Sequence, residues 1–170
     1  VVDPRVPYYY FNQLTDSTDA TSKTDYRDGA FVSIMMGSNS TNASMNQEAS
    51  MSVIGIYPVG GKYDDGKGGK IGAKSGSGIA PDKMLQAYSV PFMKAELALA
   101  GEINDDAEEL LKDAINASIY HVNAVTAKAD PTVQLIDSTK QNLFINSIIN
   151  QFDSATPEKK MEIVMTQKWI

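Results

Sequence analysis

The chain has 170 residues, 42% of them hydrophobic, which is enough for one domain with a real core. Its 15 basic and 21 acidic side chains give a net charge of -6 without a clustered basic stripe, which argues against non-specific nucleic-acid binding. The absence of cysteine excludes thiolate metal sites, disulfides and a cysteine nucleophile, and the single histidine, His121, excludes a histidine-rich zinc site.

Residues 1–80 are typical of loops and short extended pieces. Tyr8–Phe11 and Phe31–Ile34 are strand-like, and Ser, Thr, Asn and Asp dominate between them. Residues 60–78 are rich in glycine and lysine, so we expect a mobile or ligand-adapted loop there. The chain starts without an initiator methionine, an apolar signal segment or a lipidation cysteine, so we expect any targeting element to lie outside it.

From residue 81 onward the pattern is helical. The first helix is predicted from about Gln86 to Ala100, with a buried stripe that includes Phe92, Ala95 and Leu99. Pro91 favours a start near Tyr88 or Ser89, because a proline deep inside a helix costs about 3 kcal/mol.

Three further helices follow. The second is predicted over residues 105–127, with Asn104 or Asp105 as its cap and acidic residues in its first turn. The third covers residues 138–152 and carries an apolar face of Phe144, Ile145, Ile148, Ile149 and Phe152.

The fourth helix opens with Thr156-Pro157-Glu158, which are a capping residue, a proline at the first helical position and an acid in the first turn. Its amphipathic pattern reaches Ile170 without a stop signal, so we expect the protein to continue beyond that residue. We also expect the face with Met165 and Trp169 to pack on the third helix or on an associated chain.

These elements predict a mainly α-helical fold of two antiparallel helical hairpins, with a loop-rich N-terminal half that contains short strands. We expect a single partial domain of a larger protein, loop-rich over residues 1–80 and helical over 81–170. In the first hairpin, the turn glycine, two small residues and one large residue have tetratricopeptide spacing: Gly101, Ala107, Leu111 and Ala114.

Four segments, in this order, resemble the SusD/RagB-like outer-membrane lipoproteins. They are Asp3–Tyr9, the tyrosine- and glycine-rich stretch Ile56–Asp65, the helix segment Phe92–Leu97 with its Ala-Glu pair, and Ile163–Ile170 with its Gln-Lys-aromatic motif. The segments are spread from residue 3 to residue 170, so the resemblance spans most of the length of the chain.

The resemblance implies a non-enzymatic protein, mostly helical with tetratricopeptide-like units. Members of this family are held by an N-terminal lipid on the outer face of a Gram-negative outer membrane. They capture oligosaccharides, or peptides in some branches, and form the lid of a SusC-like TonB-dependent transporter. This chain would be an internal part of such a protein, and the lipid would lie outside it.

On this reading, aromatic stacking and side-chain hydrogen bonds hold the ligand in a shallow site built from loops. Tyr26, Tyr57 and Tyr63 lie beside loops and suit exposed stacking. The candidate ligand-binding residues are Tyr26, Arg27, Tyr63, Asp64 and Asp65. We expect no catalytic residue, metal site or cofactor, and we interpret His121 as a packed or surface-bonded histidine.

Two other functions stay open. The first is a helical-repeat module that binds another protein and no small molecule, which the tetratricopeptide spacing suggests. The second is a glycoside hydrolase, suggested only by the abundant carboxylates. It would need two facing acids about 5 to 10 Å apart in a cleft, and the sequence shows no such pair.

Overall fold

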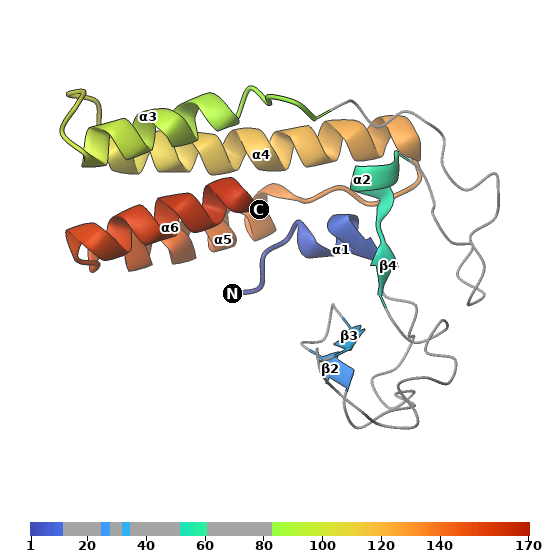
Figure 1. Ribbon diagram of the computed structural model, residues 1–170. Helices are drawn as coiled ribbons and strands as arrows, with labels where there is room; N and C mark the ends of the chain where they lie inside the picture. Colours follow the sequence, from blue (N-terminus) through green and yellow to red (C-terminus); the bar gives the residue numbers. More distant parts are fainter. Residues whose placement is uncertain (12–24, 28–31, 35–51, 61–82) are drawn as a thin grey trace. The chain divides into compact units, whose positions relative to one another are not determined.

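The computed structural model describes residues 1–11, 25–27, 32–34, 52–60 and 83–170 (Figure 1). They fall into two compact units, which we treat separately. The helical unit contains described residues 1–4, 83–123 and 136–170, and the N-terminal unit contains described residues 5–11, 25–27, 32–34, 52–60 and 124–135. The described part of the chain is mainly α-helical, as predicted.

Four long helices occupy the region where four were predicted: α3 (Ser89–Leu99), α4 (Ala107–Ala129), α5 (Ser138–Asp153) and α6 (Pro157–Trp169). The start of α3 at Ser89 confirms the argument from Pro91, which lies in the first turn, where its missing N–H leaves no broken bond. Asp106 caps α4, accepting hydrogen bonds from the Glu108 and Glu109 amides at 2.8 and 3.3 Å. The prediction of Asn104 or Asp105 as the cap is therefore wrong.

The starts of α5 and α6 follow from their capping residues. The Asp137 side chain accepts a hydrogen bond from the Lys140 amide at 2.9 Å, so α5 begins at Ser138, as predicted. The Thr156 hydroxyl accepts from the Lys159 amide at 3.4 Å, and Pro157 is the first residue of α6. Local sequence alone therefore determines both helix starts.

One apolar core joins the four helices. α5 buries its predicted face, although Ile148 is only half-buried, and Leu99 of α3 is half-buried as well. The buried members come from every helix: Phe92 and Ala95 of α3, Leu111, Ala114, Ile115, Ile119 and Val122 of α4, Phe144, Ile145, Ile149 and Phe152 of α5, and Val164 of α6. Burying a side chain of this size contributes about 1.5–3 kcal/mol, so this core is the main stabilising element of the unit.

Side-chain contacts link the four helices to one another. One side-chain pair illustrates each contact: Tyr88, at the N-cap of α3, with His121 of α4; Asn116 of α4 with Gln141 of α5; Phe152 of α5 with Lys160 of α6; and Lys168 of α6 with Glu96 of α3. The first helix of the four therefore packs on the last, which is the arrangement of a helix bundle.

The α3–α4 turn has the geometry that its glycine predicts. Gly101 has a φ of +77°, a left-handed conformation that favours glycine, and the Glu102 amide donates to the Leu97 carbonyl at 2.9 Å. Leu111 and Ala114 are fully buried and Ala107 is half-buried. The local spacing is therefore consistent with a close-packed helix pair, while a tetratricopeptide-like stack stays a prediction.

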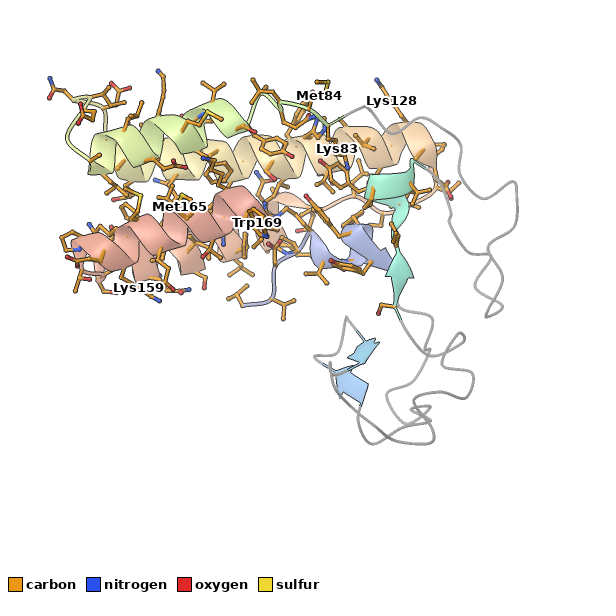
Figure 2. All side chains as sticks on the ribbon, in the orientation of Figure 1. Lys83, Met84, Lys128, Lys159, Met165 and Trp169 are labelled. Carbon is orange, nitrogen blue, oxygen red and sulfur yellow. The ribbon has the colours of Figure 1, made fainter. Side chains whose placement is uncertain are left out.

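The face of α6 that we expected to be covered is exposed. Trp169 is 92% exposed and Met165 is also exposed, whereas Val164 and Gln167 are the buried side chains of the helix (Figure 2). Each residue advances a helix by about 100°, so the sides with Val164 and Met165 differ. Packing of Met165 and Trp169 on the third helix is therefore wrong, while contact with an associated chain stays a prediction.

In the N-terminal unit, the strand predicted over Tyr8–Phe11 is mostly wrong. Val6–Tyr9 form a single-turn helix, α1, and only Tyr10–Phe11 are extended, as β1. Pro7 fixes a helix-compatible φ in this turn, and the Arg5 carbonyl accepts from the Tyr8 amide at 2.9 Å. These local effects outweigh the strand preference of consecutive aromatic residues.

β1 pairs in antiparallel fashion with β4 (Val53–Ile54), which leads through Gly55 into the short helix α2 (Ile56–Val59). The Gly55 amide donates to the Tyr9 carbonyl at 2.7 Å. A Cβ atom on Gly55 would overlap the Tyr8 carbonyl oxygen and approach the Tyr10 nitrogen to 2.8 Å. Only glycine therefore allows this close backbone contact.

Tyr57 of α2 was expected to be an exposed stacking residue, and this is wrong. Its side chain is 1% exposed, and its ring centroid lies 4.8 Å from that of Tyr9 in α1. Tyr9 itself is half-buried, and the Tyr8 hydroxyl donates to the Gln134 carbonyl at 2.5 Å. These tyrosines thus hold the N-terminal unit together.

Candidate functional site

Two of the five predicted ligand residues lie in a described strand. Tyr26 and Arg27 belong to β2 (Asp25–Arg27), which pairs with β3 (Val32–Ile34) so that Tyr26 is opposite Ser33 and Arg27 opposite Val32. Tyr63, Asp64 and Asp65 lie outside the described residues, as does nearly all of the glycine-rich loop. The five-residue site therefore stays a prediction.

A pair of acids meets where α4 begins and α5 ends. The carboxyl groups of Glu108 and Asp153 are hydrogen-bonded, and the pKa of Glu108 is raised by desolvation and by the adjacent Asp153 charge. The Lys112 ammonium nitrogen lies 3.8 Å from a carboxylate oxygen of Glu108, and its charge lowers the pKa of Glu108. Acids in direct contact leave no space for a glycosidic bond between them, so this pair does not meet the requirement for glycoside hydrolysis.

His121 lies on the half-buried side of α4. Its ring centroid is 5.7 Å from that of Tyr88, and its pKa is lowered by burial and by the nearby Lys83 ammonium group. The pKa of Lys83 is itself lowered by burial. A neutral imidazole packed against an aromatic ring agrees with the interpretation of His121 as a packed histidine. Among the described residues, no three His, Asp or Glu side chains are grouped so that they could hold a metal ion.

The two helix motifs that carry the family resemblance meet in space. Glu96 of α3 and Lys168 of α6 form an ion pair at 2.7 Å, with both side chains more than two-thirds buried. Their neighbours Ala95 and Gln167 are buried as well. The Ala-Glu pair and the Gln-Lys pair are thus explained by packing between α3 and α6.

The exposed aromatic side chains of the helical unit are Tyr120 on α4 and Trp169 on α6. Tyr120 is not among the predicted site residues, although its position in the sequence carries a signal. It lies opposite the apolar stripe of Leu111, Ile115 and Val122, and alanines occupy positions 117 and 124 beside it. An aromatic residue on the polar side of an amphipathic helix is not needed for the core.

In the described part of the chain, no helix is both long and apolar enough to cross a membrane. The family model SusD-like_2, described as "Starch-binding associating with outer membrane", matches residues 1–170. No curated protein and no solved structure matches the chain. The matched description names binding and names no reaction, in agreement with a non-catalytic protein. The whole chain therefore belongs to the SusD-like_2 family of starch-binding proteins associated with the outer membrane.

Proposed function

We propose that this chain is part of a surface glycan-binding protein that delivers oligosaccharides to a SusC-like TonB-dependent transporter. The observation that carries the proposal is the family match over residues 1–170, whose description joins starch binding to the outer membrane. An N-terminal lipid on the full-length protein would hold it on the extracellular face of that membrane.

The proposed ligand site contains Tyr26, Arg27, Tyr63, Asp64 and Asp65. Tyrosine rings would stack on the apolar faces of sugar rings, while arginine and aspartate would bond to hydroxyl groups. Each good stacking contact contributes about 1 kcal/mol beyond area burial, so several are needed for useful affinity. A peptide ligand is the alternative that the same loop site allows.

The exposed apolar side chains of α3 and α6 favour a protein partner. Val90, Met93 and Leu97 follow one another at i, i+3 and i+7 and are all exposed, so α3 presents an apolar stripe to solvent. Met165 and Trp169 do the same on α6. We assign these faces to contact with the transporter or with another part of the protein. The α3–α4 hairpin would act as a tetratricopeptide-like unit, a role that the buried Leu111 and Ala114 support.

Calorimetric titration of the full-length protein with maltoheptaose, a linear starch fragment, tests the binding function. Saturable binding is expected, and Tyr26→Ala combined with Tyr63→Ala should weaken it more than tenfold. Trp169→Ala is the matched control, because it removes an exposed aromatic ring from α6 and leaves the five proposed site residues unchanged. Unchanged affinity in the double variant would remove both tyrosines from the site. If no glycan bound and a peptide did, the ligand class would change.

Co-purification from membranes tests the partner. A tagged full-length protein should retain a TonB-dependent transporter, and Trp169→Ala or Met93→Ala should reduce the amount retained. Recovery of the transporter together with a complete lack of small-ligand binding would favour the purely protein-binding function instead.

A further inference from the structure

The solvent-facing side of α4 carries an exposed tyrosine among polar side chains. Tyr120 is 75% exposed, and Asp113, Asn116 and Ala117 precede it by seven, four and three residues. All four therefore lie on one side of the helix. Gln141 of α5 reaches this side, because its Nε2 donates to the Asn116 Oδ1 at 2.6 Å. We name Asp113, Asn116, Tyr120 and Gln141 the tyrosine platform.

The aromatic ring of the platform is open to a ligand. Side chains on a helix lean toward its N-terminus, so the ring of Tyr120 lies over the turn that contains Asn116 and Ala117. The exposed fraction of Tyr120 is 75%, so its neighbours leave most of the side chain uncovered. Tyr120 is therefore a broad apolar surface in direct contact with solvent, beside amide groups.

The polar groups beside the ring have unused hydrogen-bonding capacity. Within the described part of the chain, the Asn116–Gln141 bond leaves the Asn116 Nδ2 donors and the Gln141 Oε1 acceptor without other partners. The exposed Asp113 carboxylate likewise makes no hydrogen bond or ion pair with any described residue. The platform thus offers two acceptors and one donor group beside an aromatic face.

Two further hydrogen bonds fix the platform before any ligand arrives. The Asn123 side chain donates to the Ile136 carbonyl at 3.0 Å and accepts from the Ile136 amide at 2.9 Å. Together with the Asn116–Gln141 bond, these contacts hold the beginning of α5 against α4. A site held in this way loses little conformational entropy on binding.

We propose that the tyrosine platform binds one pyranose ring of a neutral oligosaccharide. Tyr120 stacks on the apolar face of the sugar, the Asn116 amide donates to a hydroxyl oxygen, and Asp113 and Gln141 accept from hydroxyl groups. Asp113 and Tyr120 are about 10 Å apart along the helix axis, which leaves room for a ring between them. None of the four platform residues has a cationic side chain, and Asp113 carries a negative charge. The platform therefore disfavours anionic sugars.

This proposal rests on the glycan-binding function proposed above and adds a second contact to it. The test measures the dissociation constant of maltoheptaose for the full-length protein and for variants of Tyr120 and Asn116, with circular dichroism to verify that each variant is folded. Tyr120→Ala should weaken binding about fivefold, because a lost stacking contact of about 1 kcal/mol corresponds to that factor. Asn116→Ala should weaken it by a similar or smaller factor.

Two variants serve as matched controls. Tyr120→Phe keeps the ring and should bind within about twofold of the wild type, and Trp169→Ala removes an exposed ring elsewhere and should do the same. Equal affinity of the wild type and Tyr120→Ala would overturn the tyrosine platform and leave the glycan-binding function intact. Absence of binding by the wild type would overturn both.

Discussion

The helical unit and the N-terminal unit are held together in different ways. In the helical unit, helices of 11 to 23 residues bury apolar side chains from each helix in one core. In the N-terminal unit, described elements of two to four residues are joined by backbone contacts, such as the bond from the Gly55 amide to the Tyr9 carbonyl. The helical unit should therefore tolerate changes on its surface, while the N-terminal unit depends on a few tyrosine contacts and on the close backbone contact at Gly55.

The largest expected effect comes from the helical core. Leu111→Ala should lower the free energy of unfolding by about 2–5 kcal/mol, because Leu111 is fully buried and its removal leaves a cavity. Leu143→Ala is the matched control on an exposed site of α5 and should change stability by less than about 0.5 kcal/mol. Urea denaturation followed by circular dichroism measures both. Similar effects of the two changes would contradict the assignment of the core.

In the N-terminal unit the critical site is a glycine. Gly55→Ala should destabilise this unit by about 1–3 kcal/mol, because the added Cβ overlaps the backbone of Tyr8 and Tyr10. Hydrogen exchange should show faster exchange of the Gly55 and Tyr10 amides, with little change in α5. Gly101→Ala provides the comparison, since no atom lies within 4 Å of its Cβ and only its positive φ opposes the change. Equal exchange rates in Gly55→Ala and the wild type would refute the close contact.

A smaller effect is expected at the ion pair between α3 and α6. In a double-mutant cycle of Glu96→Gln and Lys168→Met, the coupling free energy should be about 1 kcal/mol, because the two side chains are mostly buried. The exposed pair Lys159–Glu162 within α6 is the control and should give about 0.3 kcal/mol. If the exposed pair had a coupling free energy as large as that of Glu96–Lys168, burial would not strengthen the ion pair.

The smallest expected effect is a pH dependence in the helical unit. The pKa of His121 is lowered in the folded state, so the unfolded state binds a proton first as the pH falls below about 6.5. The contribution of His121 to stability is complete above that pH and should be lost as the pH falls further; the loss should be small, because the imidazole is only partly buried.

Thermal unfolding between pH 7.5 and 5.5 measures this loss. His121→Gln should remove the pH dependence of stability. Lys83→Met should only weaken that dependence, because burial lowers the pKa of His121 more than the Lys83 charge does. An unchanged slope in His121→Gln would assign the pH dependence to other groups.

The difference between the units also explains which features could be predicted. Thr156 and Pro157 determine the start of α6 by local hydrogen bonding and φ preference, and Pro91 determines the start of α3 in the same way. The short helix at Val6–Tyr9 was missed because aromatic residues suggest strands, whereas Pro7 and the Arg5 carbonyl decide the turn.

Features that depend on distant residues could not be predicted. Tyr57 lies beside a glycine-rich stretch, which suggested exposure, but its ring is covered by contacts that include Tyr9, 48 positions earlier in the numbering (57 minus 9). The Met165 and Trp169 face was assigned to packing because these residues are apolar, yet α6 uses Val164 and Gln167 instead. The bond between Asn116 and Gln141 could not be predicted either, because the two residues are 25 positions apart and meet only when α5 packs on α4.

The contact between α3 and α6 has a consequence for how the protein folds. Glu96 and Lys168 are 72 positions apart, so forming their contact first would close a long loop at an entropic cost of about 4 kcal/mol. If α4 and α5 pair first through Asn123 and Ile136, only 13 positions apart, most of that loop is already ordered. We therefore expect α6 to dock late in folding and to be the first helix of the four to detach under denaturant.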